Sequence, residues 1–175
     1  MEDLAGAISI ELNHLVGQPI GDCWRAVDMQ IFEFGPRHPM INRNGEVVEV
    51  SDIRLHIQCR WRFLSSDRIL FGQDDLYYSS DPDISSATFD WRNQLSALDV
   101  TQRGWFRQHR DNPPRVVMVS GDNYGGFRVE IDGGFALECV PCDSQSHEHW
   151  RLFGHRENGS HFVITGDGLE NDAAC

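Results

Sequence analysis

The chain contains no lysine, and all 15 of its basic side chains are arginine. Arginine offers a planar fork for bidentate and stacked contacts, whereas the mobile point charge of lysine is absent. Acidic residues outnumber basic ones by 27 to 15, which gives a formal net charge of −12. A surface this acidic repels nucleic-acid phosphates and anionic lipid, and it steers a basic protein toward itself. We therefore expect a basic protein partner, and neither a nucleic-acid nor a membrane partner.

The sequence also lacks long apolar runs and the motifs of common enzymes. No segment approaches the ~20 apolar residues that a membrane-spanning helix needs. There is no nucleophile elbow, phosphate loop, dinucleotide fingerprint or His-Glu-x-x-His helix. These absences favour a non-enzymatic protein without a cofactor, and we assign no catalytic residue from the sequence.

Cysteine is scarce and odd in number, with five residues in the chain. The N-terminal segment begins acidic and has no basic flank, so we do not expect a secretory signal there. We interpret the cysteines as reduced thiols rather than a disulfide framework, and we expect a cytoplasmic protein.

Hydrophobic periodicity predicts the elements of the first half. Residues 4–16 have apolar side chains near helical spacing and predict an N-terminal helix. Residues 23–35 predict a first strand that ends at Gly35-Pro36, followed by a loop over 37–45. Residues 46–63 alternate most clearly and predict one long strand, half buried through Ile53, Leu55, Ile57, Cys59, Trp61 and Phe63.

In the second half, residues 74–80 predict a short strand and Asp90 is a candidate N-cap for a second helix that ends before Gly104. Five short segments between 115 and 166, separated by glycine-rich turns, predict a β-meander. The polar tail 167–175 is expected to be disordered. The whole chain, 1–175, is predicted to be a single α+β domain, mainly antiparallel sheet with two helices.

The segment 133–153 carries the densest set of candidate site residues. Cys139, Cys142, His147 and His149 form a C-x2-C-x4-H-x-H pattern, whose thiolates and imidazoles are the ligands that structural zinc prefers. The spacing is compressed, however, and on a strand the two cysteines point in opposite directions. A small zinc domain is therefore the weaker alternative, and we expect no metal there.

The second candidate in this segment is a recognition surface formed by Glu148, His149, Trp150 and Arg151. On a regular strand, His149 and Arg151 share one face, and Glu148 and Trp150 share the other. Tryptophan and arginine are the side chains most enriched in binding hot spots, so Trp150 and Arg151 are the candidate anchors for a partner. The competing interpretations are a structural tryptophan that is half buried at a sheet edge, and an enzyme site assembled in space near Glu148, His149 and Arg151.

Four segments together resemble an uncharacterised family of bacterial proteins: RAVDMQIFEFG (25–35), LHIQCRWRF (55–63), DLYYSS (75–80) and the stretch from 133 to 166. The family pattern in the last stretch is GG-[FY]-x-L-E-V-F-P-x-x-S-x-x-x-E-x-W-R, and it is matched by Gly133, Gly134, Phe135, Leu137, Glu138, Pro141, Ser144, Glu148, Trp150 and Arg151. The resemblance implies no established activity and no requirement for cysteine at 139 or 142. Similar small acidic domains occur among the immunity proteins of bacterial toxin systems, so the hypothesis with the best support is a non-enzymatic binding protein, of the kind that inhibits a basic toxin.

Overall fold

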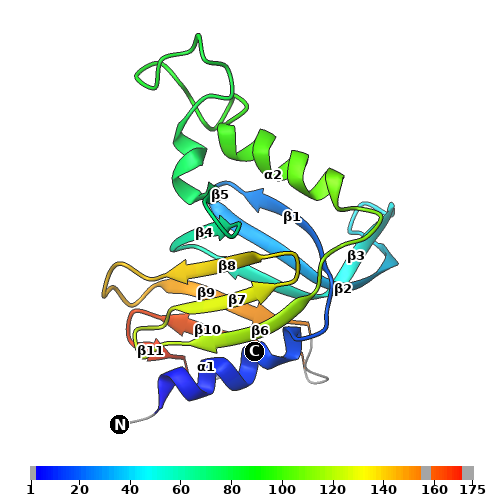
Figure 1. The fold of residues 1–175 in the computed structure, drawn as a ribbon, viewed down its shortest axis with the longest axis vertical. Helices are drawn as coiled ribbons and strands as arrows, with labels where there is room; N and C mark the ends of the chain where they lie inside the picture. The colour runs from blue at the N-terminus through cyan, green and yellow to red at the C-terminus, as the bar shows by residue number, and fades with distance from the viewer. Residues whose placement is uncertain (1–2, 155–158, 171–175) are drawn as a thin grey trace.

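A computed structural model describes residues 3–154 and 159–170, which form two antiparallel β-sheets and two α-helices (Figure 1). The six-stranded sheet has the order β1-β2-β3-β9-β10-β11, and the five-stranded sheet has the order β5-β4-β8-β7-β6. The strands are β1 (Ile20–Ala26), β2 (Met29–Ile41), β3 (Val47–Ile57), β4 (Arg60–Leu64), β5 (Ile69–Gly72), β6 (Val116–Gly121), β7 (Phe127–Ile131), β8 (Phe135–Val140), β9 (Glu148–Phe153), β10 (Phe162–Thr165) and β11 (Gly168–Leu169). The predicted α+β class is therefore confirmed.

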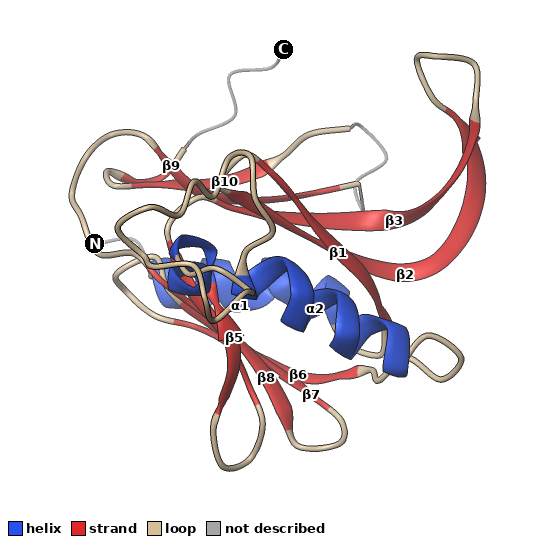
Figure 2. Cartoon of the chain, turned by 90° about the horizontal axis from the view of Figure 1, so that it is seen from above, coloured by secondary structure: helices blue, strands red, loops and turns tan. Residues whose placement is uncertain are grey.

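The helices lie at opposite ends of the two sheets. α1 (Leu4–Leu12) continues into a 3-10 turn, η1 (Asn13–Leu15), and packs along β6. α2 (Ala97–Gln108) lies at the other end, against β1, β5 and the 3-10 helix η2 (Gln73–Tyr77). Figure 2 shows the six-stranded and five-stranded sheets on opposite sides of these helices.

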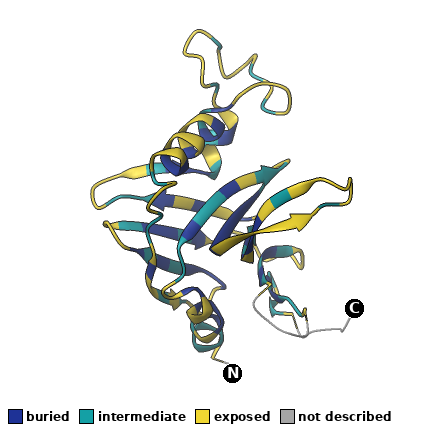
Figure 3. Cartoon of the chain, turned by 90° about the vertical axis from the view of Figure 1, so that its right-hand side faces the viewer, coloured by how far each residue is buried: buried dark blue, intermediate teal, exposed yellow. Residues whose placement is uncertain are grey.

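One hydrophobic core fills the space between the sheets and the helices. Aromatic rings from several elements meet there: Phe32 and Phe71 both pack edge-on against Trp61, and Phe63 stacks on Phe71. In Figure 3 buried residues concentrate along the facing strands, whereas the long loop between η2 and α2 is mostly exposed.

The segment 46–63 forms two strands in different sheets, so the prediction of one long strand is wrong. All six predicted inward residues are nonetheless buried. The break lies at Gln58 and Cys59, whose backbone N–H groups both donate to the carbonyl oxygen of His149. The chain bends at this corner from β3 into β4, and because it bends around a single core, the same side chains stay inside.

The predicted first strand is also two strands, β1 and β2, joined by a tight turn at Val27 and Asp28. Val27 adopts a left-handed conformation with φ of 61°, which is uncommon for a β-branched residue and carries no sequence signal. β2 then passes through Gly35-Pro36 with a register shift and continues to Ile41. Much of the predicted loop 37–45 is therefore strand, and the turn begins only at Asn42.

The second helix begins six residues later than predicted. Ser96, and not Asp90, is its N-cap, and Asp99 completes a capping box with it. The helix runs through Gly104 to Gln108. The predicted strand 74–80 falls largely on η2 instead, where the carboxylate of Asp75 accepts a hydrogen bond from the backbone N–H of Gly72.

The C-terminal half contains the five predicted strands, β6 to β10. β6, β7 and β8 form a meander in one sheet, and the chain then crosses to the other sheet for β9 and β10. Gly168–Leu169 form β11 beside β10, so the expected disorder does not extend over 167–170, and residues 171–175 lie outside the described residues. Among the described residues, neither helix is long and apolar enough to cross a membrane.

Replacing Leu55 with alanine should lower the free energy of unfolding by at least about 2 kcal/mol, through lost burial and a cavity. Leu55 is fully buried in the core cluster. Arg60 is the control, because its exposed side chain pairs with an exposed Asp74, and Arg60→Ala should cost less than about 1 kcal/mol. Urea unfolding of both variants measures this difference, and equal losses would mean that the inward face is wrongly assigned.

Candidate functional site

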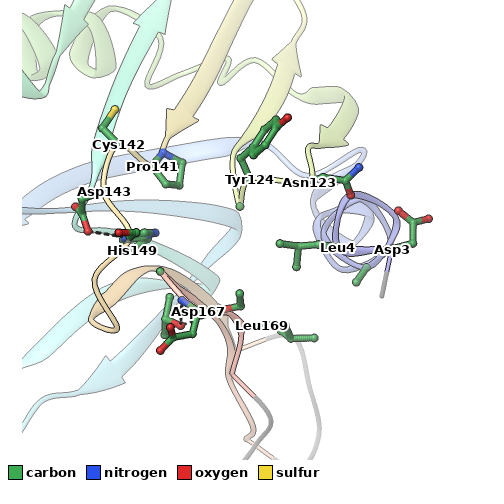
Figure 4. Close-up of a pocket in the computed structure, with 16 residues that line it drawn as sticks. Asp3, Leu4, Asn123, Tyr124, Pro141, Cys142, Asp143, His149, Asp167 and Leu169 are labelled. Carbon is green, nitrogen blue, oxygen red and sulfur yellow. Dashed lines mark hydrogen bonds and ion pairs between the residues drawn. The ribbon is translucent and has the colours of Figure 1, made fainter. Parts of the chain in front are cut away.

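A large hollow lies where the N-terminus of α1 meets three turns (Figure 4). Its volume is about 950 Å³. The walls are the first turn of α1, the β6–β7 turn around Tyr124, the β8–β9 loop over 141–144, His149 and the β10–β11 turn over 165–169. Segments far apart in the sequence therefore meet at one place.

Two glycines allow these turns to come together. Gly125 has a left-handed φ of 84°, which closes the β6–β7 turn, and the Asp122 carboxylate accepts from the backbone N–H groups of Tyr124 and Gly126 within it. At Gly166, any side chain would collide with the backbone carbonyl of Gln145. Glycine at 166 therefore lets the β10–β11 turn lie directly against the β8–β9 loop.

The charge of the hollow is negative. Asp3, Asp143 and Asp167 line it together with His149, and none of its described lining residues is an arginine. Asp3 also has a structural role, since its carboxylate caps α1 by accepting from the backbone N–H of Gly6. Tyr124 stands at the rim with 87% of its surface exposed. Such a hollow favours a cationic ligand.

His149 reaches the hollow because β9 is bulged at this residue. Ile164 of β10 lies opposite Trp150, and the next residue, Thr165, lies opposite Glu148, which leaves His149 without an opposite partner in β10. The extra residue turns its side chain out of the regular alternation. The imidazole is 2% exposed, and its Nδ1 has no hydrogen-bond partner among the described residues.

Asp143, His147 and His149 converge beside the hollow. Asp143 Oδ1 lies 3.4 Å from His149 Nε2, and Asp143 Oδ2 lies 3.6 Å from His147 Nε2. The pKa of Asp143 is lowered, chiefly because the backbone N–H of Gln145 donates to its carboxylate and in addition because the two imidazoles lie nearby. The carboxylate therefore keeps its negative charge to lower pH.

The four residues of the C-x2-C-x4-H-x-H pattern, the weaker alternative of a zinc site, are not brought together. Cys139 is buried in the core with its Sγ 3.2 Å from that of Cys59, and burial raises its pKa well above the usual thiol value. A thiol held protonated is a poor metal ligand, since the thiolate is the form that binds. Cys142 is exposed and its Sγ donates to the carbonyl of Val140. Neither cysteine belongs to the group of side chains that could hold a metal in the described chain.

The tryptophan of the predicted recognition surface is in the core, so the expectation of an exposed or half-buried Trp150 is wrong. Its side chain is 0% exposed and packs edge-on against Phe127 and beside Phe162. Its Nε1–H donates to the carbonyl of Gly125 at 2.7 Å. Trp150 thus stabilises the β6–β7 turn, which lines the hollow, and its ring is not accessible to solvent.

Glu148 and Arg151 lie together on the outer face of the six-stranded sheet. Residues three apart lie on opposite faces of a regular strand, but the bulge at His149 brings this pair to the same face, where the guanidinium donates to the carboxylate. His56 lies opposite Arg151 on β3. Its pKa is lowered to about 4, first by burial and then by the charge of Arg151, so this imidazole is neutral at neutral pH.

The bulge therefore divides the candidate residues among three environments. His149 lines the hollow, Trp150 is in the core, and Glu148 and Arg151 form an ion pair on the outer face. The predicted arrangement of two strand faces is wrong for this reason. The residues that sequence reasoning missed are Asp143 and Tyr124. The D-x3-H-x-H spacing of Asp143 with His147 and His149 was the sequence signal that could have identified Asp143.

The fold and the hollow define the class of this protein, a single α+β domain of two antiparallel sheets with an acidic hollow at one end. Comparisons with protein-family models, with curated proteins and with solved structures found no match. The resemblance of the 133–166 segment to an uncharacterised bacterial family stays a prediction.

Proposed function

We propose that this chain is a non-enzymatic binding protein that holds a basic segment of a protein partner in the acidic hollow. The observation that carries the proposal is the lining of the hollow, with three aspartates, one buried histidine and no arginine among its described residues. The net charge of −12 adds long-range attraction for a basic partner. Inhibition of a basic toxin by an immunity-type protein is the kind of activity that such a site would serve.

The binding mode that we propose places an arginine or lysine side chain of the partner in the hollow. Asp167 would pair with its charge, and Tyr124 would cover its apolar stem at the rim. An exposed tyrosine is well suited to this role, because its ring has a large apolar area, an electron-rich face for cations and few torsions to immobilise. The partner contacts therefore shift from Trp150 and Arg151, the anchors expected from the sequence, to the lining of the hollow.

A cytoplasmic location is part of the proposal. The four cysteines in the described part of the chain, Cys23, Cys59, Cys139 and Cys142, are free thiols, which is compatible with a reducing compartment.

The proposal is tested with a short arginine-rich peptide, which is expected to shift the amide NMR signals of the β6–β7 turn, the β8–β9 loop and the β10–β11 turn. Asp167→Asn should weaken peptide binding about two- to five-fold, as expected for the loss of one exposed ion pair. Tyr124→Ala should weaken it by at least as much. Binding should also fall as salt rises, because exposed charges are screened beyond ~8 Å at physiological ionic strength.

Asp83→Asn is the matched control, since it removes the same charge from the exposed loop between η2 and α2. If attraction were due to net charge alone, the two aspartate variants would weaken binding equally. That result, or peptide-induced shifts spread over the whole surface, would contradict a specific site in the hollow.

A further inference from the structure

We infer that Asp143, His147 and His149 form a binding site for one divalent transition-metal ion, and that zinc is the ion that fits their donor set. Each residue offers one ligand atom, and the three atoms lie within 4.8 Å of one another. The site does not depend on the proposed basic partner, because its ligands come entirely from this chain.

One carboxylate oxygen of Asp143 already lies at a suitable distance from the imidazole of His149. In a tetrahedral zinc site with bonds of about 2.0–2.1 Å, neighbouring ligand atoms are roughly 3.4 Å apart. Asp143 Oδ1 lies 3.4 Å from His149 Nε2 and matches this spacing, whereas His147 Nε2 lies 3.6 Å from the other oxygen, Oδ2. His147 must therefore move to bind the same ion as Asp143 Oδ1 and His149, and its exposed side chain precedes β9.

Backbone features fix the other two ligands. The backbone N–H of Gln145 donates to Asp143 Oδ1 at 3.0 Å and so orients the carboxylate. The bulge in β9 fixes His149, whose carbonyl accepts from two N–H groups at the β3–β4 corner. Two ligands held by the backbone and one mobile ligand at the surface allow an ion to enter and the site to close around it.

His149 supplies the second, independent indication of a ligand. A buried imidazole is costly unless its ring nitrogens find partners. Nδ1 of His149 has none among the described residues, and Nε2 has only the 3.4 Å contact with Asp143. The ring is therefore weakly bonded to the described residues, and coordination of an ion through Nε2 would replace that long contact with a strong bond while leaving Nδ1 unchanged.

The donor set selects the kind of ion. Two imidazoles and one carboxylate suit zinc and its neighbours cobalt and nickel, whereas magnesium and calcium prefer oxygen ligands and copper(I) prefers sulfur. Asp143 and His149 both line the hollow. The fourth coordination position can therefore hold water or a ligand atom, as in three-ligand zinc sites.

Isothermal titration of untagged, chelator-treated protein with zinc chloride tests the site, and we expect one equivalent to bind. His147→Ala is the main variant, because an exposed side chain can be removed without loss of the fold. It should weaken zinc binding by more than the ~10-fold that loss of even an outer hydrogen-bond partner of a metal ligand costs. Asp143→Asn should act in the same direction. His38→Ala is the control, since His38 is also exposed and lies 3.5 Å from a single carboxylate, that of Asp52, and it should leave the affinity unchanged.

Cobalt(II) substitution separates this site from one that uses cysteine. We expect the visible bands of tetrahedral cobalt without the near-ultraviolet charge transfer of a cobalt–thiolate bond. Such a charge-transfer band, absence of zinc binding, or equal affinity in wild type, His147→Ala and Asp143→Asn would each overturn the assignment. The titration contains no peptide, so its failure would leave the proposed basic partner standing, and failure of the peptide experiment would leave the metal site standing.

Discussion

Replacement of Trp150 by alanine is expected to lower the free energy of unfolding by about 3–5 kcal/mol. The indole projects from β9 and is fully buried, where it contacts Phe127 of β7 and Phe162 of β10. Its removal leaves a large cavity and also leaves the Gly125 carbonyl without its donor. Urea unfolding followed by far-UV circular dichroism measures the loss.

Two further variants show which property of Trp150 matters. Trp150→Phe keeps most of the apolar area but loses the indole N–H, so it should cost about 1–3 kcal/mol for the unpaired carbonyl together with a smaller cavity. Arg151→Ala, next along the chain, should cost no more than about 1 kcal/mol, because its ion pair with Glu148 is partly exposed. A loss below about 1 kcal/mol in Trp150→Ala would contradict a core position, and would restore Trp150 as a candidate surface anchor.

The fold class was predictable because it depends on local patterns. Alternation of apolar and polar residues over 46–63 identified six buried side chains of that segment, and turn-rich spacing after residue 115 identified β6 to β10. Neither pattern indicates where the chain passes from a strand of one sheet to a strand of the other. At the β3–β4 corner this point is set by the His149 carbonyl, which lies about ninety residues away in sequence.

The composition of the candidate site was less predictable, for a related reason. Whether a side chain in β9 points inward or outward depends on the bulge opposite β10, and a bulge is a property of two paired strands. Regular alternation predicted His149 and Arg151 on the same face of β9, whereas the bulge puts Arg151 on the same face as Glu148. The walls of the hollow come from five separate segments, and the pairing of the strands and the packing of α1 on β6 bring these together.

Helix α2 illustrates how tertiary contacts select among capping signals. Asp90 and Ser96 are both acceptable N-caps by residue type. The carboxylate of Asp90 instead stabilises a local turn by accepting from Arg92 and Asn93. Ser96 is buried and forms a capping box with Asp99, which is also bound by Arg25 from β1. The helix therefore begins where its first turn can form an ion pair with β1.

The ion pair between Asp99 of α2 and Arg25 of β1 is expected to contribute strongly to the free energy of unfolding. Asp99 accepts from Arg25 Nε at 2.8 Å and Nη2 at 2.9 Å, and from Ser96 Oγ at 2.8 Å. The side chains of Arg25 and Asp99 are only 18% and 6% exposed. Breaking a buried pair by removing one partner costs about 3–5 kcal/mol, because the remaining charge is left unpaired. Asp99→Asn should therefore lower the free energy of unfolding by about 3 kcal/mol at neutral pH.

The same pair makes the effect of Asp99→Asn depend on pH. Burial raises the pKa of Asp99, but the hydrogen bonds from Arg25 and Ser96 outweigh it and lower the pKa from 3.8 to about 2. Because the pKa is lower in the folded state, the resulting stabilisation is present above pH ~4 and is lost as the pH falls toward 2. A pKa difference of this size is equivalent to about 2 kcal/mol. Urea unfolding of wild type and Asp99→Asn should thus differ by about 3 kcal/mol near pH 6 and by only about 1 kcal/mol near pH 2.

Comparison of two proteins at each pH isolates this one carboxylate. Glu138 and Asp143 also have lowered pKa values, but they titrate in both proteins and cancel in the difference. Asp74→Asn serves as the control, since Asp74 pairs with Arg60 at the surface, where both side chains are at least 60% exposed. That variant should change the free energy of unfolding by less than about 1 kcal/mol at either pH. A gap between wild type and Asp99→Asn that stays constant from pH ~6 to ~2 would show that Asp99 acts through its shape and its capping hydrogen bonds, and not through its charge.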